Sequence, residues 1–339
     1  MEMYLTIYRT PLAARQLAEY RAFLEACGLR DEEDADLVAW MTDDEARLVA
    51  CGALAGHTIK QLAVAPEAEG QGVMATVISA LISEAAAGGI TRLFLCTKPA
   101  NRQMFGSLGF YPVVETPDAV LMENRRGGAD DFIASIPVYE GVRGAVVCNC
   151  DPFTLGHRHL IEHAASRCGH LYVFAVSESG SAFTPEERLD MIRRGTADIV
   201  NCHVYASDLY LISRATFPAY FIKDRAHAEE VRADLDIGFF AGCLAPALGI
   251  TKRFVGCEPL DPVTRAYNER MRELLPQRGI EFEEIPRLTD GSGEYISAGR
   301  VRALMKEAAG LSGQDREEVL DKIKALVPQT TFETIEKHL

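Results

Sequence analysis

Residues 144–165, GAVVCNCDPFTLGHRHLIEHAA, constrain the fold more than any other stretch of this chain. The apolar run Ala145–Val147 predicts a strand, the next residues predict a turn, and a helix is predicted to open near Gly156. The start of a helix offers free N–H groups and the positive end of its dipole, which favour a phosphate by ~0.3–1 kcal/mol per exposed charge. We expect Gly156 to let that phosphate approach the backbone and His157 to donate a hydrogen bond to it, as a neutral or a charged imidazole.

Two short motifs in this chain resemble the paired motifs of nucleotidyltransferases. Thr154-Leu155-Gly156-His157 resembles the HxGH ("HIGH") signature, with Thr154 in place of the first His. The string ISAGRVR (296–302) resembles the I-S-x-[ST]-x-[IV]-R motif that closes such sites, with Gly299 in place of Ser or Thr. It again opens a predicted helix, and its guanidinium groups suit phosphate oxygens.

This resemblance implies a set of nucleotide-binding residues, with His157 and Arg302 as the catalytic pair. Arg300 and Arg302 stand two apart on a helix, so we expect only one of them to face the site and favour Arg302. Glu258 either holds the ribose or the rim of the adenine or lies in a surface turn. The full predicted set is Asn149, Phe153, Thr154, Gly156, His157, Gly256, Glu258, Ser297, Arg300 and Arg302.

The composition limits the partners of the chain. The 339 residues are enough for two domains with separate cores, and 48% hydrophobic and 25% charged residues are ordinary for a globular protein. A formal net charge of −14 argues against a nucleic-acid or membrane-surface partner. The sequence offers neither a signal peptide nor an apolar run long enough for a membrane span, so we expect a cytoplasmic protein.

We expect no resident metal site. Cys148 and Cys150 form a C-x-C pair that could bind a metal or act in redox chemistry, but buried small side chains are the favoured interpretation. His159 and His163 stand i, i+4 on the predicted helix without a companion ligand pattern, so a solvated or supporting role is favoured for both.

The first third of the chain resembles the GNAT acetyltransferases over residues 1–123. A predicted strand (59–65), a loop with Gly70 and Gly72, and a predicted helix (73–87) resemble their motif A, L-A-V-x-P-x-x-x-G-x-G. The string from Asn101 to Phe110 resembles their closing motif. The resemblance implies that Val64, Gly70 and Gly72 hold the pyrophosphate end of a coenzyme A-like arm.

Three residues of this part depart from the GNAT pattern. Glu69 stands where a basic or amide residue is usual, Met74 replaces a small residue, and Phe105 lacks the hydroxyl of the Tyr that many members use to protonate the thiolate. Three interpretations stay open: a GNAT fold kept for packing, a domain that binds a coenzyme A-like ligand without acetyl transfer, and a true acetyltransferase.

The predicted organisation is an N-terminal GNAT-like mixed α/β domain (1–123), a polar linker (124–143), and a Rossmann-like parallel-sheet nucleotidyltransferase domain with C-terminal helices (144–339). From Gly144 onward, predicted strands alternate with predicted helices, one of them over 217–223. Such alternation indicates right-handed crossovers and a ligand at the carboxyl ends of the strands, where both nucleotide motifs lie.

A GNAT-like domain followed by a T-x-G-H domain resembles the [citrate (pro-3S)-lyase] ligase family over nearly the whole chain. Departures from the family pattern are Asp151 for Asn, Gly299 for Ser and Ser177 for a Lys that can contact triphosphate. The longer strings that carry the resemblance are TKP (97–99), GTADI (195–199), ISRATFP (212–218), LAPALG (244–249) and RFVGCEP (253–259).

The family resemblance implies an ATP- and Mg²⁺-dependent ligase that activates acetate as acetyl-adenylate. The acetyl group would then pass to the thiol of the coenzyme A-like prosthetic arm on the acyl carrier subunit of citrate lyase, with AMP and pyrophosphate as by-products. Mg²⁺ is expected to arrive with the triphosphate.

Two other functions stay open at this point. One is adenylyl transfer to an acceptor such as pantetheine phosphate, since the D-P-x-T-x-G-H motif of that enzyme is similar to residues 151–157. The other is a non-catalytic module that senses ATP or acyl-CoA.

Overall fold

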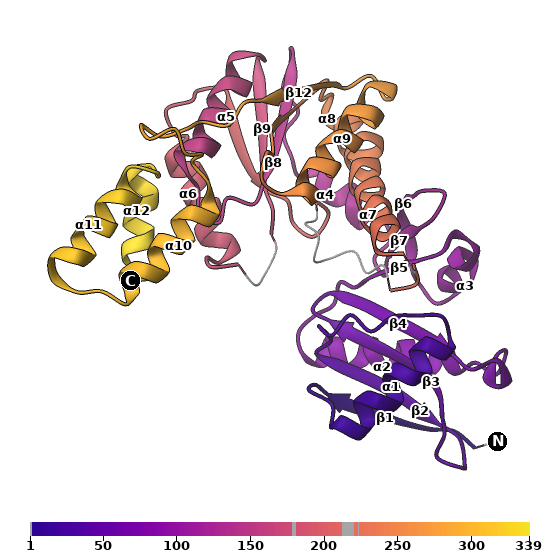
Figure 1. Cartoon of the computed structure of the whole chain (residues 1–339). Helices are drawn as coiled ribbons and strands as arrows, with labels where there is room; N and C mark the ends of the chain where they lie inside the picture. Colours follow the sequence, from indigo (N-terminus) through magenta and orange to yellow (C-terminus); the bar gives the residue numbers. More distant parts are fainter. Residues whose placement is uncertain (1, 178–180, 212–219, 223) are drawn as a thin grey trace. The chain divides into compact units, whose positions relative to one another are not determined.

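The structure is a computed structural model that describes residues 2–177, 181–211, 220–222 and 224–339. It divides into two compact units, one of residues 1–131 with 216–238 and one of residues 132–215 with 239–339 (Figure 1). The segment 216–238 therefore groups with the first unit, although the sequence-based boundaries placed it in the second domain. The string 212–218 and most of the helix predicted over 217–223 lie outside the described residues.

The first unit is built on a mixed seven-stranded sheet with the order β1-β2-β3-β4-β5-β7-β6. All neighbouring strands are antiparallel except β4 and β5, which are parallel and pair only at Thr58–Phe94 and Ile59–Leu95. The strands are β1 (Tyr4–Arg9), β2 (Leu37–Thr42), β3 (Leu48–Ala55), β4 (Thr58–Val64), β5 (Phe94–Thr97), β6 (Tyr111–Glu115) and β7 (Val120–Glu123).

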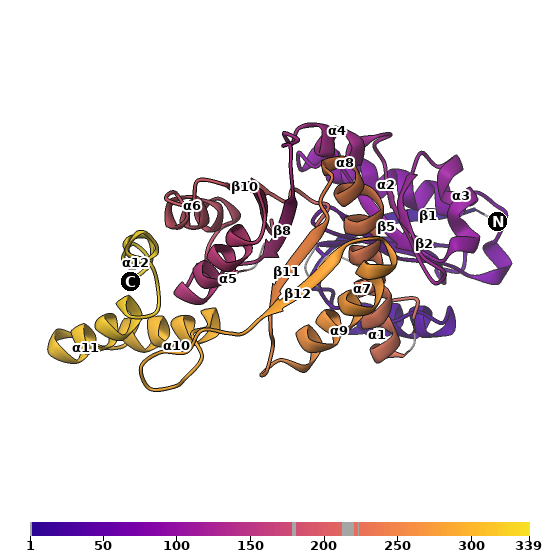
Figure 2. The ribbon, with the colours of Figure 1, turned by 90° about the horizontal axis from the view of Figure 1, so that it is seen from above.

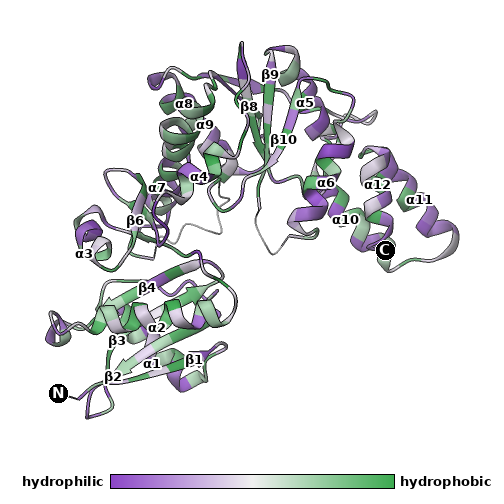
Figure 3. Cartoon of the chain, turned by 180° about the vertical axis from the view of Figure 1, so that it is seen from behind, coloured by the Kyte–Doolittle hydropathy of each residue, from purple (hydrophilic) through white to green (hydrophobic). Residues whose placement is uncertain are grey.

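Helices bury both faces of this sheet. Alternate residues of β2 point to opposite faces, so Ala39 joins the core with Val77 and Leu81 of α2, while Trp40 packs with Tyr20 of α1. Figure 3 shows the hydrophobic residues concentrated on these strands and on α2. The helices here are α1 (Ala14–Ala26), α2 (Val73–Ala87), α3 (Arg102–Ser107) and α7 (Arg225–Phe239), with 3₁₀ turns η1 (Pro66–Ala68) and η2 (Pro99–Asn101).

The second unit contains a five-stranded sheet with the order β10-β9-β8-β11-β12, in which all neighbours are parallel. This is the strand order 3-2-1-4-5 of a Rossmann-like sheet, and the order reverses between β8 and β11. The sequence-based fold class is confirmed for both parts of the chain. The strands are β8 (Arg143–Cys148), β9 (His170–Ala175), β10 (Cys202–Ala206), β11 (Lys252–Gly256) and β12 (Glu281–Ile285).

Capping side chains mark the starts of several helices in the second unit. Thr184 and Glu187 form a capping box at the start of α6, and Asp261 caps α9 through the Val263 N–H. The helices α10, α11 and α12 gather at the α6 side of the sheet (Figures 1 and 2). The helical segments are α5 (Leu155–Ser166), α6 (Pro185–Gly195), η3 (Phe240–Leu244, a π-helix), α8 (Ala245–Leu248), α9 (Pro262–Gln277), α10 (Ala298–Ala309), α11 (Gly313–Lys324) and α12 (Gln329–Glu336).

Among the described residues, the helices α3, α4 (Gly128–Ala134), α7, α8 and α12 had no counterpart in the sequence-based prediction. The seven-residue helix α4 lies inside the stretch that was predicted as an irregular linker because of its Gly and Asp residues. Within the described residues, no helix is long and apolar enough to cross a lipid bilayer.

Candidate active site

The two nucleotide motifs lie at the carboxyl edge of the parallel sheet, where its strand order reverses. Asn149 follows β8, Gly256 ends β11, and α5 opens at Leu155. In open α/β sheets, ligands bind outside the carboxyl ends of the strands at this reversal. The topology therefore points to the same edge as the motifs.

Thr154 and His157 form a reciprocal cap at the start of α5. The Thr154 hydroxyl accepts from the His157 N–H at 3.4 Å, and the Thr154 N–H donates to His157 Nδ1 at 3.1 Å. Thr154 is only 1% exposed, so its hydroxyl is engaged inside the protein. Because Nδ1 accepts this hydrogen bond, the proton of the neutral imidazole resides on Nε2, which is free to donate outward.

His157 is held neutral by its surroundings. Burial, and to a smaller extent the positive charge of Arg287, lower the pKa of His157 to about 4. The Phe153 ring is fully buried and lies nearly parallel to the imidazole, with the ring centres 6.0 Å apart. The expected donor is thus a neutral Nε2–H with a fixed ring orientation.

Gly156 brings the two motifs together. A Cβ at this position would lie 2.9 Å from the carbonyl oxygen of Ile296, the first residue of the second motif. The sequence-based reason for this glycine was access of a phosphate to the backbone, but the close neighbour in the structure is the backbone of Ile296. Gly156 therefore lets the segment before α10 pack directly on the start of α5.

The arginines of the second motif face different partners. One Arg302 N–H donates to the carbonyl oxygen of Asp151, and the same nitrogen lies 3.6 Å from the Asp151 carboxylate. Arg300 instead pairs with Asp290 at 2.6 Å and with Glu294 at 3.1 Å. Ser297 caps α10 by accepting from the Arg300 N–H at 3.2 Å. Of the two arginines, Arg302 is the one that joins the first motif, and 43% of its side chain remains exposed.

Asn149 and Asp151 organise the turn between β8 and α5 from within. The Asn149 side-chain oxygen accepts from the buried Arg188 of α6. The Asp151 carboxylate accepts from the N–H groups of Ala182 and Phe183 at 3.1 and 3.0 Å. A carboxylate can accept both bonds with separate oxygens, which explains how Asp serves at the position where the family pattern has Asn.

A pocket of about 560 Å³ lies at the ends of β11 and β12, against α9. Glu258 lines it, but its carboxylate accepts from the Leu260 and Asp261 N–H groups at 3.0 and 3.1 Å and pairs with Arg287. The lining residues are Cys257, Glu258, Pro259, Arg265, Asn268, Glu269, Arg272, Glu284, Pro286, Arg287, Thr289 and Tyr295. The pocket is large enough for a nucleoside.

The cysteine and histidine pairs have ordinary partners. The thiols of Cys148 and Cys150 are in contact, both are free, and burial raises the pKa of the Cys150 thiol. His163 Nε2 lies 2.9 Å from the Glu283 carboxylate. In the part of the chain that the structure describes, no three His, Cys, Asp or Glu side chains are grouped so that they could hold a metal ion.

In the first unit, the loop between β4 and α2 takes the conformation that its glycines allow. Gly70 and Gly72 have φ of +74° and +76°, and Gly72 precedes the first turn of α2 without a side-chain cap. Val64 ends β4 and is half-buried. A phosphate could approach this helix start without meeting a side chain at either glycine.

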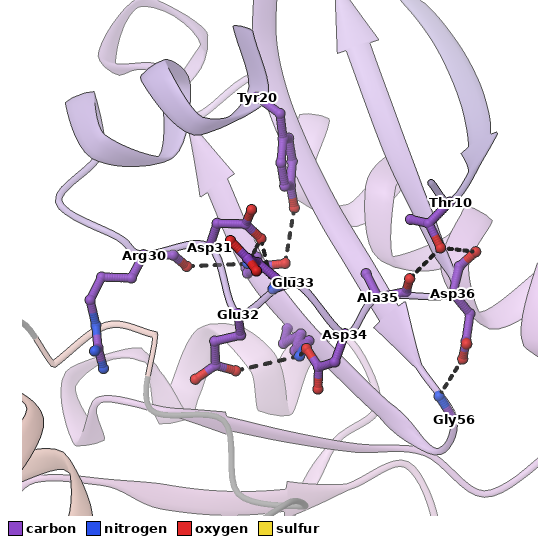
Figure 4. A network of polar contacts seen from close by, with 12 residues as sticks. Thr10, Tyr20, Arg30, Asp31, Glu32, Glu33, Asp34, Ala35, Asp36 and Gly56 are labelled. Carbon is purple, nitrogen blue, oxygen red and sulfur yellow. Dashed lines mark hydrogen bonds and ion pairs between the residues drawn. The ribbon is translucent and has the colours of Figure 1, made fainter. Parts of the chain in front are cut away.

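The edge of β4 that faces β5 is covered by Tyr220. The Leu62 N–H donates to the phenol oxygen of Tyr220, and the Arg30 N–H donates to its carbonyl oxygen at 2.9 Å. Tyr220 is 4% exposed. Around it, Gln61 accepts from the Tyr20 hydroxyl and donates to the Arg30 carbonyl and the Asp31 carboxylate (Figure 4).

Charged residues reinforce this part of the first unit. The side chain of Lys60 on β4 is 2% exposed and pairs with Glu32 and Asp34, both labelled in Figure 4. Glu32 also lies 3.3 Å from Arg232 of α7. A buried lysine needs such partners because an uncompensated charge is costly in the interior. These ion pairs attach α7 to the strand that carries Val64.

Comparison with known proteins gives the family of the chain. Residues 143–335 match the model of the citrate lyase ligase C-terminal domain, and residues 1–110 match the acetyltransferase (GNAT) family. The chain belongs to the citrate lyase ligase family.

Three relatives in this enzyme family, each named [citrate [pro-3S]-lyase] ligase, cover most of the chain. The protein from Klebsiella pneumoniae is 41% identical over 84% of this chain and 85% of its own length. The protein from Escherichia coli (strain K12) is 36% identical over 86% and 85%, and that from Haemophilus influenzae is 36% identical over 95% and 96%. Among solved structures, Escherichia coli ElaA aligns with 37% of this chain and all of its own, at 15% identity and a TM-score of 0.33.

Sequence reasoning about this ligase family missed Arg287 and Arg188. Arg188 lies within an ordinary helical pattern, and no neighbouring residue indicates that its side chain contacts Asn149. Arg287 had a usable signal, because a basic residue directly after the last parallel strand must lie at the ligand edge of the sheet.

We expect the Gly156→Ala substitution to separate the two motifs. The added Cβ would meet the Ile296 carbonyl at 2.9 Å, so we expect a loss of ~1–3 kcal/mol in the free energy of unfolding together with weaker ATP binding. Gly299→Ala is the matched control, since its Cβ would meet only the Arg302 guanidinium at 3.9 Å. Urea unfolding and ATP titration of both variants measure the effect; equal stability of the two would contradict this role of Gly156.

We expect His157 to make the unfolding free energy depend on pH. With a folded pKa of about 4 and an unfolded pKa of about 6.5, the unfolded chain binds more protons between these values. Stability contributed by the neutral imidazole is present above about pH 6.5 and is lost as pH falls toward 4, by ~1–3 kcal/mol. Urea unfolding of the wild-type and His157→Gln chains across this range measures it, and identical pH slopes would exclude the effect.

Proposed function

We propose that this chain acetylates the thiol of the coenzyme A-like prosthetic arm on the acyl carrier subunit of citrate lyase, using ATP and acetate. The names of the relatives support citrate lyase as the target. The observation that carries the nucleotide step is the meeting of two helix starts, α5 with the neutral His157 and α10 with Arg302, through the contact of Gly156 with Ile296. Two helix starts and a guanidinium at one place suit a triphosphate.

In the first step, an oxygen of acetate attacks the α-phosphorus of ATP in line, and the bond from that phosphorus to the β-phosphate oxygen breaks. Acetyl-adenylate forms and pyrophosphate leaves with the bonding electrons. This chemistry depends mainly on positioning and charge stabilisation. The His157 Nε2–H would donate to a phosphate oxygen, and Arg302 would bind the departing pyrophosphate.

In the second step, the thiol of the prosthetic arm attacks the acyl carbon of acetyl-adenylate. The carbon–sulfur bond forms, the bond to the phosphate oxygen breaks, AMP leaves, and the thiol proton passes to solvent. Acetyl-adenylate is a mixed anhydride, so the thioester forms without further nucleotide.

Mg²⁺ would bind with ATP and neutralise charge on the triphosphate. Within the described residues no cluster of carboxylates or histidines suits a resident ion, so we assign no step to a protein-bound metal. Thr154, Ser297 and Asn149 would shape the site through the caps and turn that they form, and Gly256 and Glu258 through the wall of the pocket. Arg300 would stabilise the loop before α10.

Pyrophosphate release from MgATP tests the proposal directly. We expect release that requires acetate, followed by thioester on the carrier when deacetylated citrate lyase is added. Release that ignores acetate and responds to pantetheine phosphate would identify adenylyl transfer instead. Bound ATP without any release would identify a sensor.

We expect His157→Ala to lower the acetate-dependent rate by ~10²–10⁴, because a preorganised donor to the reacting phosphates is lost. His159→Ala on the same helix is the control and should retain the wild-type rate. The rate of pyrophosphate release is the measurement, with thermal unfolding to verify the fold. Full activity in a folded His157→Ala chain would exclude the role assigned to this imidazole.

For the first unit, we propose that Val64, Gly70 and Gly72 receive the phosphate end of the arm. Gly72→Ala forces an alanine to φ near +76° and should weaken binding of coenzyme A by about tenfold or more. Gly89→Ala carries the same strain at φ +84°, with open space around it, beyond the other end of α2, and should bind as the wild type. Calorimetric titration of the full chain measures both; equal affinities would place the arm elsewhere.

A further inference from the structure

Arg287 is a basic residue at the carboxyl edge of the parallel sheet in the second unit. It follows β12 by two residues, and since all five strands are parallel, it lies at the same edge as His157 and Gly256. Its Nε donates to the Cys257 carbonyl oxygen at 2.9 Å, and another guanidinium nitrogen pairs with the Glu258 carboxylate. Arg287 thereby joins the loops that follow β11 and β12.

The orientation of this guanidinium is fixed before any ligand arrives. Glu258 is itself anchored, because its second oxygen accepts from two backbone N–H groups and its side chain is 8% exposed. Arg287 remains 24% exposed. A guanidinium has five N–H donors, so the contacts with Cys257 and Glu258 leave donors for a ligand. Preorganised donors of this kind are the ones that stabilise developing charge most effectively.

Arg287 also connects the two halves of the site. It lines the pocket of about 560 Å³, and it is close enough to His157 for its charge to disfavour a protonated imidazole there. A nucleotide with its nucleoside in that pocket and its outer phosphates at His157 and Arg302 would have its α-phosphate between them. In this placement Arg287, which lines the pocket, would contact the α-phosphate.

We propose that Arg287 binds the α-phosphate of ATP and stabilises the charge that develops on its non-bridging oxygens as acetate attacks. The inference rests on the proposed function and adds to it a catalytic residue that neither motif contains. It separates the work of two arginines: Arg302 holds the leaving pyrophosphate, and Arg287 holds the phosphorus that is transferred. A planar fork suits two oxygens of one phosphate, which a lysine reaches only as a point charge.

The test is acetate-dependent pyrophosphate release by Arg287→Met and Arg287→Lys. We expect the Met variant to lose ~10²–10³-fold in rate while its affinity for ATP changes less, because the contact strengthens in the transition state. The Lys variant, which keeps the charge, should recover part of the rate and also serves if the Met variant fails to fold. Arg167→Met, on an exposed residue near Glu283 at the end of α5, is the matched control and should keep the wild-type rate.

A second readout separates a direct role from a structural one. In the Met variant, the pKa of His157 measured by NMR should rise from its low value, since a neighbouring positive charge is gone. A folded Arg287→Met chain within about threefold of the wild-type rate would overturn the inference while leaving the proposed function intact. Absence of acetate-dependent release in the wild-type chain would instead overturn the proposed function.

Discussion

The contact between Gly156 and the Ile296 carbonyl is the constraint on which the rest of the second unit depends. It places two helix starts, 140 positions apart in sequence, side by side at one edge of the sheet. Both ends carry partial positive charge, and Arg302 and Arg287 add full charges. These positive charges repel one another, and the carboxylates of Asp151 and Glu258 offset the repulsion by pairing with Arg302 and Arg287.

The neutrality of His157 follows from the same crowding of positive charge. An imidazolium beside Arg287 in a half-buried site would cost both desolvation and repulsion, so the neutral form dominates. A neutral donor has an advantage here, because its Nε2–H can contact a phosphate without titrating near pH 7. The reciprocal cap with Thr154 fixes which nitrogen carries the proton. Thr154 therefore orients His157 through two hydrogen bonds, one from its backbone N–H and one to its hydroxyl.

The helices and strands of the parallel sheet were largely predictable from the sequence, but the long-range partners of their side chains were not. Strand, turn and helix around residues 144–165 were predictable because apolar periodicity and caps are local signals. The pairing of Arg302 with Asp151 and of Arg300 with Asp290 was not predictable from the sequence. Two arginines on one helix have the same local sequence signals, and only residues distant in the chain decide which partner each one meets. Arg287 was hidden for the same reason. Helix α7 was also missed, and the order of elements along the chain does not reveal that it groups with the first unit.

In the first unit, the helix start after Gly72 and the edge of β4 differ in how accessible they are to a ligand. At the helix start beyond Gly72, no cap from a side chain stands in the way of a phosphate. Along β4 the situation is reversed, because the Leu62 N–H already donates to Tyr220, and α7 behind it is fastened by Arg232, Glu32 and Lys60. A ligand with amide groups could pair with that strand edge only by replacing a buried phenol. Of these two places, the helix start beyond Gly72 is therefore the one that a ligand could reach without displacing a buried side chain.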